Sequence, residues 1–287
     1  MRSSTLVLLA AAFSGLFVPA QAPADLITRT ALMSEAVGFW AFSGGTGTTA
    51  ADSSTTTPAI PLSVGGSGSP SWQSSGGPMG GMFGSFLQFP ANSFLTTGSD
   101  QNALDFTASD PFSIAAWVKL DPGSSNVWVA SKMESSGDFR GWGLQVRGTA
   151  TSPNNAVELW LRHTNSPANY LAVRAIADVA LETDWTHLAA TYDGSGVLAG
   201  VTIYVNGKPM AIAPMSQTLT QEDTTNTVPF SIAGRNTSGS LRGAIDEVGV
   251  WSRVLTASEV ASLVPEPSAV MLLAFSMLGL FWRRRLS

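Results

Sequence analysis

Short runs in which apolar and polar residues alternate recur along most of the chain. Along residues 112–118, the apolar side chains of one face belong to Phe112, Ile114, Ala116 and Val118. Similar runs, each bounded by Gly, Ser, Asn, Asp or Pro, occupy residues 36–42, 127–132, 141–147, 156–161, 170–175, 185–192, 201–205, 208–213, 230–232 and 241–251. Alternation with a period of two residues is typical of half-buried β-strands. About a dozen such strands predict an all-β fold, an antiparallel two-sheet sandwich.

The clearest local signal is the dipeptide Asn206-Gly207, which separates the runs 201–205 and 208–213. Both central residues of a type I′ turn need a positive φ, so Asn-Gly between two strands predicts a tight hairpin. Pro209 has no amide proton to donate, and it therefore predicts that the returning strand lies at a sheet edge or contains a bulge.

Two stretches of the domain depart from the strand pattern. Thr256 and Glu259 form a capping-box sequence, which predicts the only helix of the mature domain, ending near Leu263. Residues 44–81 are rich in Gly, Ser, Thr and Pro, which favours a long surface connection. An isolated strand at 36–42 would not be stable, so this connection is not expected to be a domain boundary.

The N-terminal segment has the composition of an export signal. Arg2 is followed by an apolar run from Leu6 to Val18 and by small residues at Ala20, Ala22 and Ala24. This order predicts a signal peptide over residues 1–24, with a signal helix, that signal peptidase removes after Ala24.

The C-terminal segment combines a Pro-rich motif, an apolar run and a basic end. The motif is Val264-Pro265-Glu266-Pro267-Ser268, an uncharged run from 269 to 282 follows, and the stop is Arg283, Arg284 and Arg285. An uncharged apolar run next to an arginine cluster predicts a transmembrane helix with the arginines on the cytoplasmic side. A buried core helix would have to bury the three arginines without partners.

These three parts, in this order at the C-terminus, resemble the PEP-CTERM sorting signal of Gram-negative bacteria. The resemblance assigns residues 264–287 to that signal and implies recognition of Pro265-Glu266-Pro267 by an exosortase-type membrane enzyme. It further implies an inner-membrane-anchored intermediate and then delivery to the cell surface or the extracellular matrix. An ordinary C-terminal membrane anchor is the alternative interpretation.

Composition narrows the classes of partner. Only 12 % of the residues are charged, the net charge is −5, and four of the 15 basic residues lie in the terminal signals. The domain is therefore acidic and has no basic cluster, which argues against nucleic acid as a partner. The chain has no cysteine, so an exported domain must gain its stability from core burial rather than from disulfides.

Several segments, taken in order, resemble the laminin-G-like, concanavalin A-like jelly-roll domains of bacterial secreted proteins. These segments are residues 38–42 with 48–53, 112–118, 185–193, 203–207 and 241–251. The resemblance spans nearly all of the predicted domain, residues 25–263. It implies a two-sheet antiparallel jelly roll, a calcium ion at its rim and a carbohydrate or glycoprotein ligand.

Asp246 lies inside an apolar strand pattern, and a buried carboxylate there needs a partner. Calcium is such a partner, and Asp52 could join Asp246 as a second ligand if the first and last strands pair. The alternative is that Asp246 accepts backbone amide hydrogen bonds at a bulge. Residues 55–58 after Asp52 (Thr-Thr-Thr-Pro) depart from the Gly and Asn residues usual in the family.

Four aromatic residues fall on consecutive middle strands, namely Trp128, Trp142, Trp160 and Tyr170. An exposed row of aromatic rings would form a platform on which sugar rings stack. The alternative is that these large side chains fill the core.

Signals for catalysis are weak. Glu182 and Asp184 resemble part of the acidic cluster of jelly-roll glycanases, but residues 185–187 supply no third carboxylate. His163 and His187 show no zinc-ligand spacing, and His187 fits a packed strand residue. The sequence therefore predicts a secreted, non-enzymatic binding module for extracellular carbohydrate or glycoprotein. A structural matrix component without a specific ligand and a jelly-roll glycanase are the alternatives.

Overall fold

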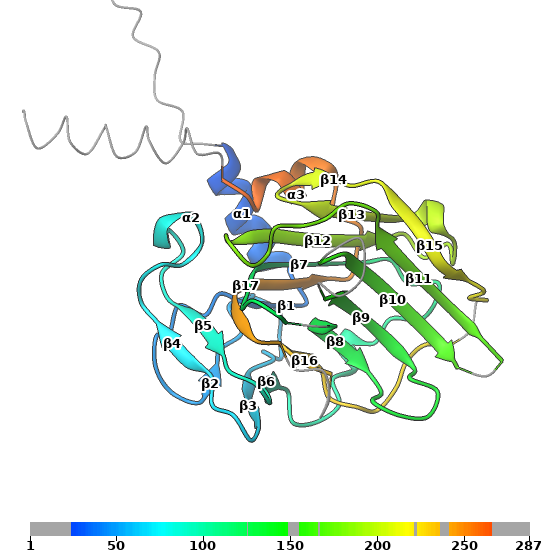
Figure 1. Ribbon diagram of the computed structural model, residues 1–287, viewed down its shortest axis with the longest axis horizontal. Coiled ribbons are helices and arrows are strands. Elements are labelled where there is room, and N and C mark those ends of the chain that lie inside the picture. The colour runs from blue at the N-terminus through cyan, green and yellow to red at the C-terminus, as the bar shows by residue number, and fades with distance from the viewer. Residues whose placement is uncertain are drawn as a thin grey trace, which may run out of the picture.

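Two antiparallel sheets lie face to face in the computed structural model, which describes residues 24–265 except 125, 149–154, 166, 221–222 and 236–240 (Figure 1). This architecture confirms the predicted two-sheet sandwich. The apolar run of the predicted signal peptide and the predicted membrane helix lie outside the described residues. Within the described ranges, no helix combines the length and apolar character that a membrane span requires.

The eight-stranded sheet consists of β1 (Gly38–Trp40), β4 (Ser71–Gln73), β5 (Phe86–Phe89), β7 (Phe112–Leu120), β12 (Thr186–Tyr192), β13 (Val201–Val205), β14 (Lys208–Pro209) and β17 (Gly243–Trp251). Its order is β14-β13-β12-β7-β17-β5-β4, and β1 also pairs with β17. The last strand of the chain therefore lies in the middle of this sheet, between β7 and β5.

The nine-stranded sheet consists of β2 (Thr49–Ala50), β3 (Leu62–Gly66), β6 (Ser93–Thr96), β8 (Val127–Met133), β9 (Gly141–Val146), β10 (Val157–Thr164), β11 (Asn169–Ala175), β15 (Ile212–Gln217) and β16 (Ser231–Ile232). Its order is β15-β11-β10-β9-β8-β16-β6-β3-β2. The helices are α1 (Ala24–Glu35), α2 (Pro78–Gly81) and α3 (Ala257–Ser262), with 3₁₀ turns η1 (Asn102–Leu104) and η2 (Leu198–Gly200).

The strongest local predictions are confirmed. Asn206 and Gly207 have φ angles of 49° and 74°, as a type I′ turn requires. Pro209 lies in β14, the edge strand of its sheet. The capping box is present, because the Thr256 side chain accepts a hydrogen bond from the Glu259 amide at 3.2 Å and Glu259 accepts one from the Thr256 amide at 2.7 Å.

The prediction of a single helix is wrong, because α1 precedes β1. Its sequence has no capping signal, and its first residue coincides with the predicted cleavage site, so nothing marked it as a helix. Short helices gain most of their stability from tertiary packing, and Leu32 of α1 is buried against the sheet. Five short strands, β2 to β6, also escaped prediction, three of them within the Gly/Ser/Thr-rich segment 44–81.

Aromatic side chains fill the main core between the sheets. The ring of Trp142 lies against Phe112 and Phe106, with centroids 5.0 and 5.5 Å apart. Its indole N–H donates to the Leu104 carbonyl at 2.8 Å, so the one polar atom of this side chain is satisfied. Burial of such rings gives a cysteine-free domain its main source of stability.

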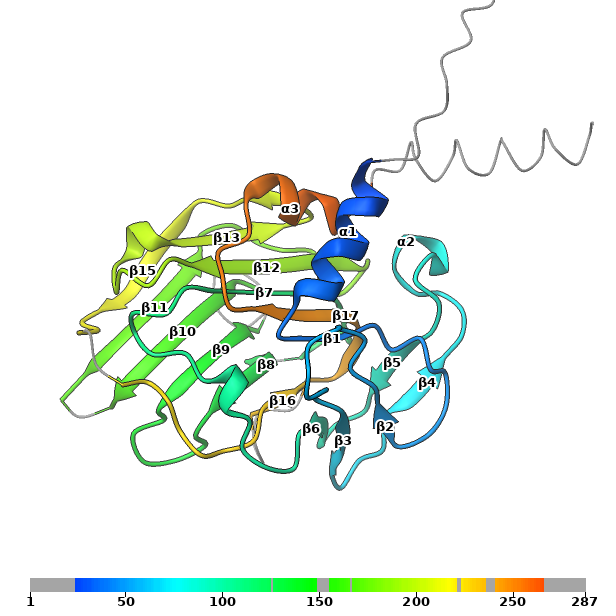
Figure 2. The same cartoon turned by 180° about the vertical axis from the view of Figure 1, so that it is seen from behind.

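A second, smaller core lies on the outer face of the eight-stranded sheet, beneath α1 and α3 (Figure 2). Ala115 of β7 and Ala189 of β12 are small enough for the helices to approach, and Leu32 and Val260 fill the space above them. Strands β7, β12 and β17 are consequently buried along nearly their whole length, whereas β10 becomes mostly half-buried from Trp160 onward.

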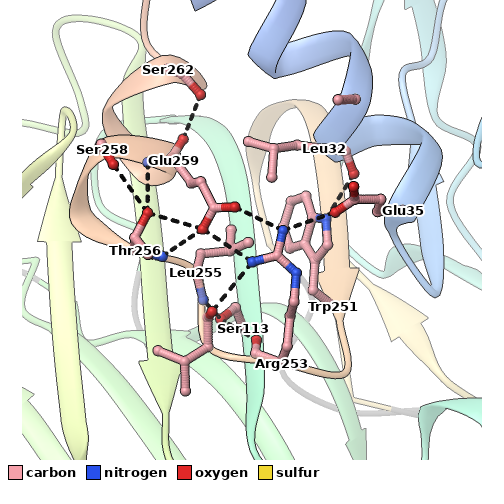
Figure 3. A network of polar contacts seen from close by, with 12 residues as sticks. Leu32, Glu35, Ser113, Trp251, Arg253, Leu255, Thr256, Ser258, Glu259 and Ser262 are labelled. Atoms are coloured by element: carbon pink, nitrogen blue, oxygen red, sulfur yellow. Dashed lines mark hydrogen bonds and ion pairs between the residues drawn. The ribbon is translucent and has the colours of Figure 1, made fainter.

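Polar contacts join the two helices to each other and to the sheet (Figure 3). The Arg253 guanidinium donates to Glu35 of α1 at 3.0 Å and to Glu259 of α3 at 2.9 Å. The indole N–H of Trp251 donates to the Leu32 carbonyl of α1 at 2.8 Å. The N-terminal and C-terminal helices of the domain are therefore held side by side.

Candidate functional site

The outer face of the nine-stranded sheet contains a cavity of about 420 Å³. On β10, Leu159 and Leu161 point into the main core. Successive side chains of a strand alternate in direction, so Trp160 and Arg162 point outward. The cavity forms over β8, β9 and β10 and is lined by Asn126, Trp128, Met133, Phe139, Gln145, Trp160, Arg162 and Arg235.

Small residues on neighbouring strands make room for the rings in the cavity. Trp160 lies opposite Gly143 of β9 and Ala172 of β11. A Cβ atom added to Gly143 would come within 2.7 Å of the Trp128 ring. The Trp128 ring therefore lies directly against Gly143 of β9, and a side chain at position 143 would push it away.

Two arginine side chains lie among the aromatic rings. The guanidinium carbon of Arg162 is 4.2 Å from the Tyr170 ring centre and 5.1 Å from that of Trp160. That of Arg235 is 5.0 Å from the Trp128 ring centre. Both guanidinium groups also lie near Phe139, at 5.7 and 5.1 Å from its ring centre. These distances are those of cation–π contacts.

The loop between β8 and β9 presents Phe139 in an unusual backbone conformation. Its φ angle is 53°, in the left-handed region that bulky side chains rarely adopt. Strain of this kind persists only where the surroundings fix it, and it is concentrated at functional sites. Here it places an aromatic ring next to both arginines.

Burial lowers the pKa values of Arg162 and Arg235, and the charge of Arg162 lowers the pKa of Arg235 further. The Arg162 Nη1 atom donates to the neutral side chain of Asn165 at 2.9 Å. Its Nε atom is buried and, among the described residues, has no hydrogen-bond partner. The cavity therefore contains two partly desolvated positive charges that repel each other.

A separate carboxylate fixes the Trp160 ring. Glu158, which is 2 % exposed, accepts hydrogen bonds from the Trp160 indole N–H and from Arg174, both at 3.0 Å. Arg147 approaches the same carboxylate at 3.8 Å. Glu158 is thus a positioning residue that already has its own cationic partners.

The four predicted aromatic residues do not share one environment. Trp128, Trp160 and Tyr170 lie on the outer face, and the Trp160 and Tyr170 rings stack with centroids 5.9 Å apart. Trp142 is 1 % exposed and lies in the main core, which corrects its place in the predicted platform. The physical reason is register, because Trp142 pairs with the inward-pointing Leu161 rather than with Trp160.

The two predicted calcium ligands have other partners in the structure. Asp52 accepts hydrogen bonds from the backbone amides of Phe39, Ser54 and Ile60, at 3.0, 2.9 and 2.9 Å. In the part of the chain that is described, no three His, Cys, Asp or Glu side chains gather as a metal-binding group. Calcium at Asp52 or Asp246 stays a prediction.

Asp246 is fully buried at a bulge of β17, beneath α1. Its Oδ1 atom accepts a hydrogen bond from the Glu247 amide at 2.9 Å, in keeping with the alternative interpretation. Arg29 of α1 forms an ion pair with Glu247 and lies 4.3 Å from the Phe83 ring centre. Burial raises the pKa of Asp246 to about 8, although the charge of Arg29 acts in the opposite direction.

His187, Trp117 and Asp246 lie in register on three adjacent strands, β12, β7 and β17. Each has one buried polar atom without a partner among the described residues, namely His187 Nδ1, Trp117 Nε1 and Asp246 Oδ2. His187 is 1 % exposed, so the expectation of a packed strand residue is confirmed. Burial and the nearby charge of Arg29 lower its pKa to about 3.

The sorting motif is described only at its beginning. Val264 and Pro265 follow α3 and line a second cavity, of about 690 Å³, together with residues of β13, β14 and the loop before β12. Glu266, Pro267 and Ser268 lie outside the described residues, as do Arg283, Arg284 and Arg285. Glu182 and Asp184 lie in the turn before β12, as the interpretation of a polar turn expected.

Sequence reasoning missed Arg162, Arg235, Phe139 and Gly143. Arg162 could have been found, because it lies two residues after Trp160 and therefore on the same face of an extended strand. Arg235 and Phe139 come from loops, where no periodic pattern indicates the direction of a side chain.

A family model described as the concanavalin A-like lectin/glucanases superfamily matches residues 90–261, more than half of the chain. The chain belongs to this superfamily. A second model, the PEP-CTERM protein-sorting motif, matches residues 263–285, so this superfamily member has the predicted sorting signal at its C-terminus. Among curated proteins, no sequence matches the chain.

Solved structures show the same lectin-like fold at low sequence identity. Domain 4 of the extracellular arabinanase AbnA of Geobacillus stearothermophilus, solved with arabinotriose, is 18 % identical with a TM-score of 0.57, and the match covers 80 % of this chain and 98 % of that one. The binding domain of botulinum neurotoxin serotype G is 17 % identical with a TM-score of 0.54, over 80 % of this chain and 50 % of that one. The binding domain of Paraclostridial Mosquitocidal Protein 1 is 14 % identical with a TM-score of 0.55, over 81 % and 52 %. The chain thus spans about half the length of these two toxin domains.

Proposed function

We propose that the protein is an exported, non-enzymatic module that binds extracellular carbohydrate, or the glycan of a glycoprotein, on the outer face of its nine-stranded sheet. The observation that supports this most directly is the pair Trp128 and Trp160, which flank the small residue Gly143 in a cavity of about 420 Å³. That volume is within the range of small-ligand sites, roughly 300–1,000 Å³.

The chemistry of the lining suits a sugar. The half-buried ring of Trp160 offers apolar surface to the C–H face of a pyranose or furanose, whereas Trp128, which is 5 % exposed, forms part of the cavity wall. Asn126 and Gln145 supply hydrogen-bonding amide groups at the edges of the same cavity. The arabinanase domain with a similar fold was solved in complex with arabinotriose, which is consistent with this proposal.

The lining residues favour binding over hydrolysis. Glycoside hydrolysis needs a pair of carboxyl groups on either side of the scissile bond. The described residues that line the cavity include no Asp or Glu. Glu158 lies nearby, but its charge is engaged by Arg174 and by the Trp160 indole.

The PEP-CTERM tail supports an extracellular place of action. We propose that signal peptidase removes residues 1–24 and that an exosortase-type enzyme processes the tail of an inner-membrane-anchored intermediate. The product would then reach the cell surface or the matrix of a Gram-negative bacterium. Mass spectrometry of the secreted chain tests this step by locating both new termini.

A glycan array probed with the full-length chain in mild detergent tests the binding proposal. We expect Trp160→Ala to weaken binding about tenfold or more, because it removes the less buried of the two tryptophan rings in the cavity. Trp185→Ala is the matched control, since this half-buried tryptophan contacts Phe86 in the other sheet. If no glycan binds, or if both variants bind as the wild type does, the proposal is wrong.

A structural matrix component is the second candidate function. It is favoured if the array is negative while deletion of the chain alters the extracellular matrix of the producing strain. Release of reducing sugar from a polysaccharide by the full-length chain would instead support the glycanase alternative.

A further inference from the structure

We infer that the cavity on the nine-stranded sheet selects acidic saccharides, whose anionic group binds Arg162 and Arg235 while the sugar ring lies against Trp160. This inference rests on the proposed function and specifies its ligand class. The shared chemistry is a sugar ring that bears a carboxylate or a sulfate group.

Four other arginines of the described fold lie against carboxylates, and three of them are close pairs. Arg174 binds Glu158 at 3.0 Å, and Arg29 forms an ion pair with Glu247. Arg253 lies between two glutamates. Burial of a cation without an anion is unfavourable, so these pairings are what a structural role requires.

Arg162 departs from this pattern. Its hydrogen bond to a side chain goes to the neutral Asn165, its other contacts are the faces of aromatic rings, and its buried Nε donor has no partner among the described residues. The described chain therefore provides no anion for Arg162, and its guanidinium lines the cavity, where a ligand anion can approach it.

The proximity of Arg235 strengthens the argument. Both guanidinium groups lie within 6 Å of the Phe139 ring centre, and each is partly shielded from water by the cavity wall. Two like charges in a partly desolvated cavity repel each other more than they would in water. An anion between them would turn this repulsion into two attractive contacts.

The guanidinium group also selects the type of anion. Its planar fork of N–H donors matches the paired oxygens of carboxylate and sulfate groups. The chain as a whole has a net charge of −5, so a long acidic polymer is repelled by most of the surface. Selectivity would therefore depend on the local pair of arginines rather than on general attraction.

Isothermal titration calorimetry with the full-length chain in mild detergent tests this inference. The probes are oligogalacturonate, its fully methyl-esterified form, which has the same sugar without the charge, and an oligosaccharide of sulfated dextran. We expect at least one acidic probe to bind about tenfold or more tightly than the neutral ester, and its binding to weaken as salt is added. Binding of the carboxylated but not the sulfated probe would identify a uronic acid as the ligand class.

Charge-removing variants locate the effect. Arg162→Gln and Arg235→Gln should each reduce binding of the acidic probe about tenfold and leave binding of the methyl ester unchanged. Lys208→Gln removes one exposed positive charge from β14 in the other sheet and should change neither. Circular dichroism and thermal unfolding check that each variant folds. If Arg162→Gln does not fold, Arg162→Lys replaces it, because lysine keeps the positive charge but lacks the planar pair of N–H donors.

The outcomes separate this inference from the proposed function. Equal binding of acid and ester, or acidic binding that survives both arginine substitutions, would overturn the inference and leave glycan binding intact. Loss of all binding in Trp160→Ala, with arginine variants that affect only the acidic probe, would support both. Binding of none of the probes or array glycans would contradict both.

Discussion

The two sheets use the same residue types differently on their outer faces. On the eight-stranded sheet, α1 and α3 cover the surface, Trp251 is buried, and Arg29 is paired with Glu247 (Figure 2). On the nine-stranded sheet, Trp160 and Arg162 line an open cavity. The comparison shows that the same residue types fill a core where the two helices cover the sheet and line a cavity where no described helix covers it.

The largest expected effect is a difference in the free energy of unfolding between substitution of the covered Trp251 and substitution of Trp160 in the cavity. Trp251→Ala removes a ring that contacts Phe39 and a hydrogen bond to the Leu32 carbonyl, so we expect the free energy of unfolding to fall by about 3–5 kcal/mol. Trp160→Ala should lower it by less than about 1.5 kcal/mol, because its side chain is only half-buried. Chemical denaturation followed by circular dichroism measures both, and equal losses would remove the distinction between a covered and an open face.

Substitution of Arg29 tests whether its role is structural. Arg29→Met leaves Glu247 and Asp246 buried without their cation, so we expect a loss of about 3 kcal/mol in the free energy of unfolding. Adding Glu247→Gln should recover part of this loss, because the unpaired charge is then gone. A double variant no more stable than the single one would contradict the ion-pair explanation, and glycan binding should be unchanged in both.

The smallest expected effect concerns pH. The folded-state pKa of Asp246, about 8, is above its ordinary value of 3.8, so the stability it contributes is complete below pH 4 and is lost as pH rises through 8. His187 acts in the opposite direction, because its pKa is lowered from 6.5 to about 3, and its contribution is lost as pH falls below 6.5. Between pH 6.5 and 8.5 only Asp246 changes, and we expect stability to fall by about 1–2 kcal/mol.

Asp246→Asn is the matched variant for this pH effect. It keeps the oxygen that accepts the Glu247 amide but cannot ionise, so thermal unfolding temperatures should become nearly independent of pH over this interval. A slope equal to that of the wild type would assign the effect to another group. Titration of both proteins with calcium also tests the predicted metal role of Asp246, which requires a calcium-dependent stabilisation that the variant lacks.

Local signals predicted the parts of this fold that depend on a few neighbouring residues. Asn206-Gly207 and the Thr256–Glu259 capping box each specify their own geometry, and both are confirmed. The α1 helix was missed because its stability comes from Leu32 and from contacts with α3 and the sheet, which are distant in sequence.

The sequence predicted only some residues of the candidate site, because contacts between distant parts of the chain decide which side chains reach it. Alternation places Trp142 and Trp160 on strands but does not say which face of each strand is the core. Register decides it, because Trp160 pairs with Gly143, whereas Trp142 pairs with Leu161. Arg235 reaches the cavity from a loop, where only the folded chain determines what lies beside it.

The Arg253 bridge between α3 and α1 has a consequence for how the domain is displayed. Both helices lie on the outer face of the eight-stranded sheet (Figure 2), and the sorting motif begins directly after α3, at residue 263. In the proposed tethered intermediate the tail would leave from the helix-covered sheet, next to β13 and β14, while the cavity opens on the outer face of the other sheet. The proposed attachment and the proposed ligand site would then lie on different sheets, so a surrounding polymer would reach the Trp160 ring while the domain is still tethered.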